Sequence, residues 1–136
     1  TPQDFFLSDG SDIKERLVYQ RVIQHLDNKT ALERAKIDFL MDAVKRSSFE
    51  FIRNDTIYTG PRAQAHLLWK YHRKVQSVIS ARKFIDDIAT RSSLSGDLYL
   101  VKVSEETTYP LREVLLNELT RLELLLKNET KTPIPN

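Results

Sequence analysis

The sequence predicts an α+β fold that is mainly α, a helical bundle with a small antiparallel β-hairpin or sheet in the order α-α-β-β-α-α-β-α. Apolar residues recur at helical spacing along most of the chain, and the period changes to that of strands around residues 49–58. The 136 residues, 40% of them hydrophobic, suit one core. We expect an N-terminal segment over 1–10, a single globular domain over 11–128 and a flexible C-terminal tail over 129–136.

Two helices are expected in the first third of the chain. Asp12 and Glu15 have the spacing of a capping box, which predicts a helix from there to Leu26. After a polar break, Thr30 and Glu33 repeat that spacing. They predict a second helix, whose apolar residues keep a helical period.

The next segments change from strand to helix. Residues 49–53 and 56–58 flank Asn54-Asp55, which predicts a β-hairpin with a two-residue turn. Pro61 suits the first position of a third helix, which we expect to continue to about Gln76.

The last part of the chain is expected to hold two helices and one strand. Ser80 is a typical N-cap for a short fourth helix, and residues 92–96 form a serine-rich loop. Residues 98–103 alternate like a strand, and Pro110 is expected to open the last helix. That helix has a leucine stripe at Leu111, Leu115, Leu119, Leu122 and Leu126.

The charge distribution is uneven although the net charge is only +2. From Thr56 to Ile85 there is no Asp or Glu. A local excess of positive charge of this kind attracts anions. The basic residues of this stretch are Arg62, Lys70, Arg73, Lys74, Arg82 and Lys83, with His66 and His72.

Helical spacing predicts a basic stripe on the third helix, opposite the side of Leu67 and Tyr71. Trp69 falls on this stripe, and Trp with nearby cations is typical of membrane interfaces. We therefore expect an anionic ligand or surface to bind here. The alternatives are a solvated face with Trp69 covered by other elements, or an anchor for a protein partner. The candidate residues are Arg62, His66, Trp69 and Arg73, with Lys70 and Lys74 beside them.

Several classes of function are disfavoured. There is no cysteine, and the three histidines have no acidic ligand spacing, so we expect neither a metal nor a cofactor. No apolar run is long enough for a transmembrane segment. We expect no nucleic acid as a partner, because no recognised reader motif is present and the net charge is low.

A second group of polar residues could line a pocket. Arg53 and Tyr58 come from the hairpin and Tyr99 from the later strand, although core packing explains them equally well. His66 with Ser93 or Ser95 suggests a hydrolase, but no Gly-x-Ser-x-Gly motif accompanies them. The serines are more typical of a loop that ends a helix, so we assign no catalytic residue.

Separated motifs indicate a family. They are Phe51-Ile52-Arg53-Asn54, Tyr58, Ala65-His66-Leu67-Leu68-x-Lys70, Ser80-Ala81-x-x-Phe84-Ile85 and Ser92-Ser93-Leu94-Ser95-Gly96-x-x-Tyr99. Over roughly residues 37–119 the chain resembles the YfeK-like family, small exported bacterial proteins of unknown function. Ser48 and Asp55 stand where that family often has Cys and Gly. The resemblance implies export and a shared fold, but no activity. A weaker resemblance is to small effectors of the Ntt type that the type II secretion system of Legionella releases.

Together these observations predict a non-enzymatic exported binding protein, periplasmic or secreted. As a secreted effector it would recognise an anionic surface, such as a phosphoinositide-bearing membrane, through the basic helix. The alternative is a periplasmic protein–protein interaction module or inhibitor with a host or periplasmic partner. A hydrolase built on His66 and the loop 92–96 is the third reading. The first residue is Thr1, which is compatible with removal of a signal peptide.

Overall fold

The computed structural model describes residues 2–131 and confirms the α+β, mainly α fold. Two short 3-10 helices precede the first α-helix. The elements are η1 (Pro2–Asp4), η2 (Ile13–Glu15), α1 (Leu17–Gln24), α2 (Lys29–Lys45), β1 (Glu50–Arg53), β2 (Thr56–Tyr58), α3 (Gly60–Arg73), α4 (Ala81–Asp87), β3 (Leu100–Lys102), β4 (Thr108–Pro110) and α5 (Leu111–Lys131).

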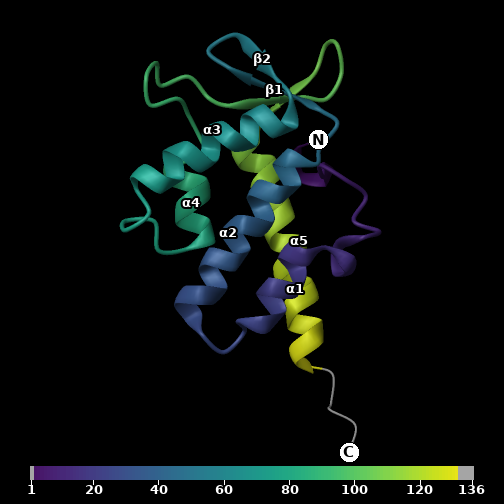
Figure 1. Cartoon of the computed structure of the whole chain (residues 1–136). Helices are drawn as coiled ribbons and strands as arrows, with labels where there is room; N and C mark the ends of the chain where they lie inside the picture. Colours follow the sequence, from purple (N-terminus) through teal and green to yellow (C-terminus); the bar gives the residue numbers. More distant parts are fainter. Residues whose placement is uncertain (1, 132–136) are drawn as a thin grey trace, which may run out of the picture.

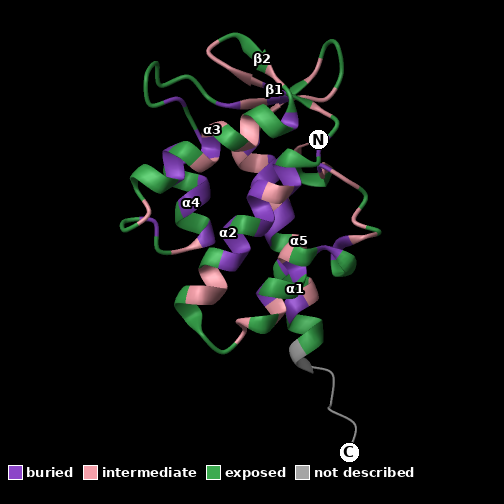
Figure 2. Cartoon of the chain, in the orientation of Figure 1, coloured by how far each residue is buried: buried purple, intermediate pink, exposed green. Residues whose placement is uncertain are grey.

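The helices form the body of the molecule and the strands lie at one end of it (Figure 1). Helix α2 packs against α1, α3, α4 and α5. Figure 2 shows the buried residues in the middle of the molecule along α2 and α5, while the tip of the hairpin is exposed. The core is apolar, which favours folding because its surface is removed from water. Its largest side chains include Phe39, Leu40, Phe84, Ile85, Leu115 and Leu122.

The strands form one antiparallel sheet in the order β2-β1-β3-β4. The predicted hairpin is present, and Asn54 and Asp55 both have positive φ, at 51° and 64°, as a type I′ turn requires. Sequence reasoning missed β4. Pro110 ends this strand and does not open the last helix, which begins at Leu111. A proline is tolerated there because β4 is an edge strand that can lack one N–H donor.

The first predicted helix begins later than its capping box indicated. Arg16 has an extended conformation, with φ −71° and ψ 137°, and it separates η2 from α1. Asp12 makes no capping hydrogen bond, and its carboxylate accepts from the buried Arg16 guanidinium at 2.9 Å. This ion pair compensates a cation that burial would otherwise penalise.

Helix α2 also begins at a different cap from the one expected. The side chain of Asn28, and not that of Thr30, accepts a hydrogen bond from the N–H of Ala31 at 3.1 Å. Thr30 lies in the first turn. Asparagine is among the preferred N-cap residues, so the structure uses the stronger of two neighbouring signals.

The N-terminal segment packs against α5, and the C-terminal end of the described chain is the end of that helix. Leu7 is buried in the core, and the amide of Asn117 donates to the carbonyls of Pro2 and Phe5. Helix α5 continues to Lys131, three residues into the expected tail. Residues 132–136 of that tail lie outside the described residues.

Candidate functional site

Helix α3 presents two different faces. Leu67 and Tyr71 are buried against the core, while Trp69 on the opposite side is 57% exposed, as helical spacing predicts. The guanidinium of Arg73 lies 4.7 Å from the centroid of the Trp69 ring. The His66 ring stacks on the Trp69 ring, with 6.4 Å between the two ring centroids. A cation over an indole face is attracted by the ring quadrupole. Trp69 is therefore an exposed aromatic surface with basic neighbours.

The helix is shorter than expected. It ends at Arg73, with Lys74 as its C-cap, and does not continue to Gln76. No glycine or proline marks this end in the sequence, which is why periodicity alone extended the helix too far. Lys74 is exposed beside the end of the helix.

A groove of about 420 Å³ lies along the exposed side of α3. Its other wall is the loop after α4, where Ser92, Ser93 and Leu94 line it. Leu94 is 90% exposed, and sequence reasoning missed it because it treated this loop as a helix terminator. The groove brings together most of the predicted site, namely Arg53, His66, Trp69, Lys70, Arg73, Lys74, Ser93 and Tyr99.

Three predicted residues do not line this groove. Arg62 is exposed in the first turn of α3. Tyr58 lies behind the groove and accepts a hydrogen bond from Arg53 at 3.0 Å. Ser95 donates to the side chain of Asn54 in the hairpin turn. Tyr58 and Ser95 therefore hold neighbouring groups in place.

Lys70 is not the surface cation that the helical stripe suggested. Its side chain is buried, with 6% exposed. The ammonium donates to the carbonyls of Ile88 at 3.0 Å and Arg91 at 2.8 Å, and to the hydroxyl of Tyr99 at 3.3 Å. Burial, and then the charges of Lys74 and Arg53, lower the pKa of Lys70 to about 8. The lysine thus joins α3 to the end of α4 while its charge faces the groove.

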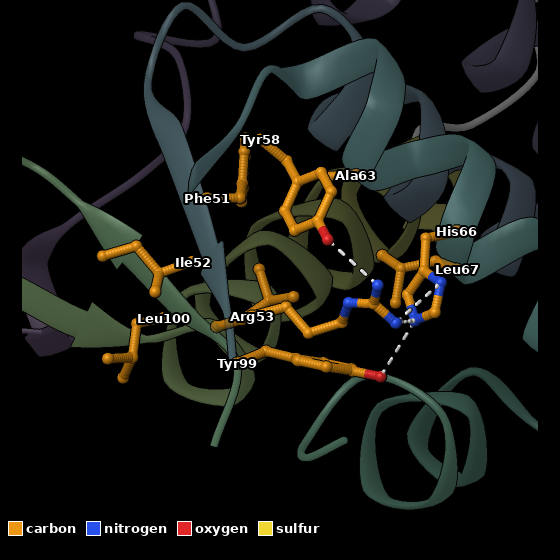
Figure 3. A pocket seen from close by; sticks show the side chains of 10 residues that line it. Phe51, Ile52, Arg53, Tyr58, Ala63, His66, Leu67, Tyr99 and Leu100 are labelled. Carbon is orange, nitrogen blue, oxygen red and sulfur yellow. Dashed lines mark hydrogen bonds between the residues drawn. The ribbon is translucent and has the colours of Figure 1, made fainter. Parts of the chain in front are cut away.

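We call the part of the groove that is lined by Arg53, His66, Lys70 and Tyr99 its inner end. There Arg53, His66 and Tyr99 form a polar network, which also borders the smaller pocket drawn in Figure 3. Nη1 of Arg53 lies 3.1 Å from Nε2 of His66, which lies 3.3 Å from the Tyr99 hydroxyl. Because a guanidinium can only donate, the His66 ring must accept and is held neutral. Burial, with Arg53 and Lys70 nearby, lowers the pKa of His66 below its ordinary value. Burial raises that of the Tyr99 hydroxyl.

All charged residues that line the groove are basic. They are Arg53, Lys70, Arg73 and Lys74, and no Asp or Glu is among the lining residues. Close like charges are unfavourable, and more so away from bulk water. The groove therefore has the electrostatic character of an anion-binding site.

The hydrolase reading depends on how His66 lies relative to the serines of the loop 92–96. Ser93 lines the groove, but within residues 2–131 no hydrogen bond joins His66 to Ser93 or Ser95. The hydroxyl of Ser92 accepts from the backbone N–H groups of Leu94 and Ser95, as expected for a loop-forming serine. A nucleophile would need a base within hydrogen-bond reach.

Metal ligands and membrane-spanning helices are the last two features to consider. In the described part of the chain, no three His, Asp or Glu side chains gather in a way that could hold a metal ion. Across residues 2–131, no helix combines the length and apolar character that crossing a bilayer requires.

The fold and the groove define a small, mainly α protein with a cation-lined groove between a helix and a loop. The chain belongs to DUF5329, a family of unknown function, whose model matches residues 31–123. This confirms the expectation of an uncharacterised family. The matched span begins in α2, ends within α5 and includes every residue of the groove. Comparisons with curated proteins and with solved structures found no match.

Proposed function

We propose that this protein is a non-enzymatic binding protein that attaches to anionic membrane surfaces through the mouth of the groove. The mouth is the exposed part of the groove, lined by Trp69, Arg73, Lys74 and Leu94. The observation that supports this most directly is that Trp69 and Leu94, both exposed apolar side chains, line a groove whose charged residues are all basic. Trp favours the boundary between lipid and water, and a leucine beside it can enter the acyl region.

The basic rim supplies the electrostatic part of this binding. Arg73 and Lys74 are exposed next to Trp69, and Arg62 is exposed in the first turn of the same helix. Basic side chains near an anionic leaflet contribute about 1 kcal/mol each. A few such groups with two inserted apolar side chains give weak, reversible binding that added salt reduces.

Vesicle co-sedimentation tests this proposal. We expect the protein to pellet with vesicles that contain phosphatidylserine or a phosphoinositide, and not with neutral phosphatidylcholine vesicles. Trp69→Ala with Leu94→Ala, and separately Arg73→Ala with Lys74→Ala, should each weaken binding at least tenfold. Equal pelleting of both double variants and the wild type would contradict the proposal.

Matched controls separate this surface from general stickiness. Leu17 on α1 is 69% exposed and lies outside the groove, so Leu17→Ala removes a comparable apolar side chain. Arg82 and Lys83 are an exposed basic pair on α4 that also lies outside the groove. Both controls should bind anionic vesicles like the wild type.

We infer export, to the periplasm or beyond the cell, from the resemblance to exported bacterial proteins. We also propose a relation to YfeK-like proteins or to type II secreted effectors. A protein–protein module is the alternative function, since Trp and Arg are frequent anchors of protein interfaces. Vesicle binding that fails for the wild type would favour this alternative.

A further inference from the structure

Hydrogen bonds hold the side chains at the inner end of the groove in place, whereas the basic side chains at its rim are exposed. Arg53 comes from β1, His66 and Lys70 from α3, and Tyr99 from the segment before β3. The Tyr58 hydroxyl accepts from Arg53, whose guanidinium lies 5.3 Å from the Tyr58 ring centroid. Binding here would order few additional side chains, which favours a specific ligand over a diffuse surface.

The charge of Lys70 is unusual within this protein. Among the residues whose burial the structure describes, three basic side chains are buried, namely Arg16, Lys36 and Lys70. Arg16 is paired with a carboxylate at 2.9 Å and Lys36 with one at 3.0 Å. In the described residues, Lys70 has only backbone carbonyls and a hydroxyl as hydrogen-bond partners. A buried cation normally requires a counter-charge, and nothing in the groove supplies one.

Arg53 adds a second positive charge at the same place. It faces His66 and Tyr58, neither of which has a carboxylate, and its charge lowers the pKa of Lys70. The network does not use all five N–H donors of its guanidinium. Two uncompensated cations side by side match a ligand with two negative charges.

We propose that the inner end of the groove binds the dianionic phosphate of a phosphate monoester, with Arg53 and His66 in contact with its oxygens and Lys70 as the buried counter-charge. The inference deepens the proposed function, on which it rests for the membrane as a source of the ligand. A terminal phosphate can enter such an inner end with three free oxygens. A diester has one charge and two substituents, and it fits this end poorly.

The shape and chemistry of the groove agree with this ligand. Its volume of about 420 Å³ falls within the size of small-molecule sites and leaves room for part of the carrier. Arginine is well suited to phosphate because its planar guanidinium can donate two parallel hydrogen bonds. The protons of Lys70 already have three partners, so its contribution is charge and not direct contact.

Soluble probes test the site without a membrane. We expect inorganic phosphate and glucose 6-phosphate to bind the full chain in calorimetry and to shift the NMR signals of His66. Glycerophosphocholine, a diester, should bind at least tenfold more weakly. Arg53→Gln should weaken phosphate binding at least tenfold, while Arg82→Gln, an equal charge change on α4 outside the groove, should leave it unchanged. Equal binding of monoester and diester would overturn the proposal.

A measurement on the wild type guards against a variant that fails to fold. Bound phosphate should raise the pKa of His66 in an NMR titration, because an anion in contact stabilises the protonated ring. A His66 titration that saturating phosphate leaves unchanged would overturn the proposed contact.

Vesicle binding distinguishes a lipid headgroup from a soluble phosphate monoester as the ligand. It also distinguishes the proposed phosphate site from the proposed membrane function. Phosphatidylinositol 4-phosphate carries a monoester, whereas phosphatidylserine carries only a diester. Stronger binding to the former at equal surface charge, lost in Arg53→Gln, supports a lipid headgroup as the ligand. Soluble phosphate binding without vesicle binding supports the site and overturns the membrane function. Equal binding to both lipids, unchanged in Arg53→Gln, supports the membrane function and overturns the site.

Discussion

Lys70 donates a hydrogen bond to the Tyr99 hydroxyl over 3.3 Å, and this contact joins helix α3 to the segment that leads into β3. The same ammonium binds the carbonyls of Ile88 and Arg91 just beyond α4. A cation near a helix C-terminus is favourable because the last carbonyls lack partners within the helix. Lys70 therefore gives the groove its buried charge and also fixes the start of the loop after α4, which is one wall of the groove.

Replacing Lys70 with Met should destabilise the fold. Met keeps much of the side-chain volume but leaves the carbonyls of Ile88 and Arg91 without their donor. A buried acceptor that loses its partner costs about 1–3 kcal/mol. Urea unfolding measures this loss. Lys74→Met, at the exposed C-cap of the same helix, should stay within about 0.5 kcal/mol of the wild type. Equal stability of Lys70→Met and the wild type would show that these bonds contribute little.

Trp69 is the single tryptophan of the chain, so its fluorescence reports on the mouth of the groove. At 57% exposure its emission maximum should lie close to that of free indole, and iodide should quench it. Anionic vesicles should shift the emission to the blue and protect it from iodide, because an inserted indole loses contact with water. A native emission that is already blue-shifted and protected would show that Trp69 is covered in solution.

The affinity for sulfate should change with pH in two ranges, one in which Lys70 titrates and one in which His66 titrates. Sulfate remains a dianion from acid to alkaline pH, so the dependence reports the protein. An anion favours the charged form of Lys70, whose pKa is about 8 in the folded protein. Affinity is therefore present below that pH and falls as pH rises through it. His66, with its lowered pKa, protonates only below its ordinary value of 6.5 and should then strengthen binding.

Other ionisable groups lie next to Lys70 and His66 and belong to the interpretation of that pH dependence. Arg53 faces His66 from β1, the Tyr99 hydroxyl faces both His66 and Lys70, and Lys74 follows Lys70 on the helix. Calorimetry with sulfate at pH 7 and pH 9 checks the prediction, and equal affinities would contradict it.

Gly60 should tolerate no side chain. A Cβ there would lie 2.5 Å from the Val44 carbonyl oxygen, 2.8 Å from that of Lys45 and 2.9 Å from that of Ser47. Gly60→Ala would push α3 away from the end of α2, and overpacking of this kind costs about 1–3 kcal/mol. Thermal unfolding should show this loss, with weaker phosphate binding because α3 carries His66.

Gly96 is the matched control for that substitution. It lies in the loop after α4 with a φ of +80° and open space around its Cα. Gly96→Ala should cost about 1 kcal/mol through backbone strain alone. A Gly96→Ala variant that is less stable than Gly60→Ala would show that the close approach of α3 and α2 is not the dominant constraint.

Local signals in the sequence predicted much of the fold. Asn54-Asp55 predicted the hairpin turn, and Ser80 predicted the cap of α4, where its side chain accepts from the N–H of Lys83. These features depend on a few neighbouring residues. The strand β4 was missed because its three residues gain their strand character from pairing with β3. The extended Arg16 was missed because its conformation depends on the ion pair with Asp12 and on burial.

The candidate site shows the same division. Helical spacing alone predicts that Trp69 lies opposite Leu67 and Tyr71, since helix geometry fixes which side chains share a face. It gave no means of separating Lys70 from Lys74, two lysines one turn apart in a basic stretch. The packing of α3 against the end of α4 buries Lys70 and leaves Lys74 exposed. This difference follows from long-range contacts, because burial depends on what packs against a residue, and Ile88, Arg91 and Tyr99 are distant in sequence.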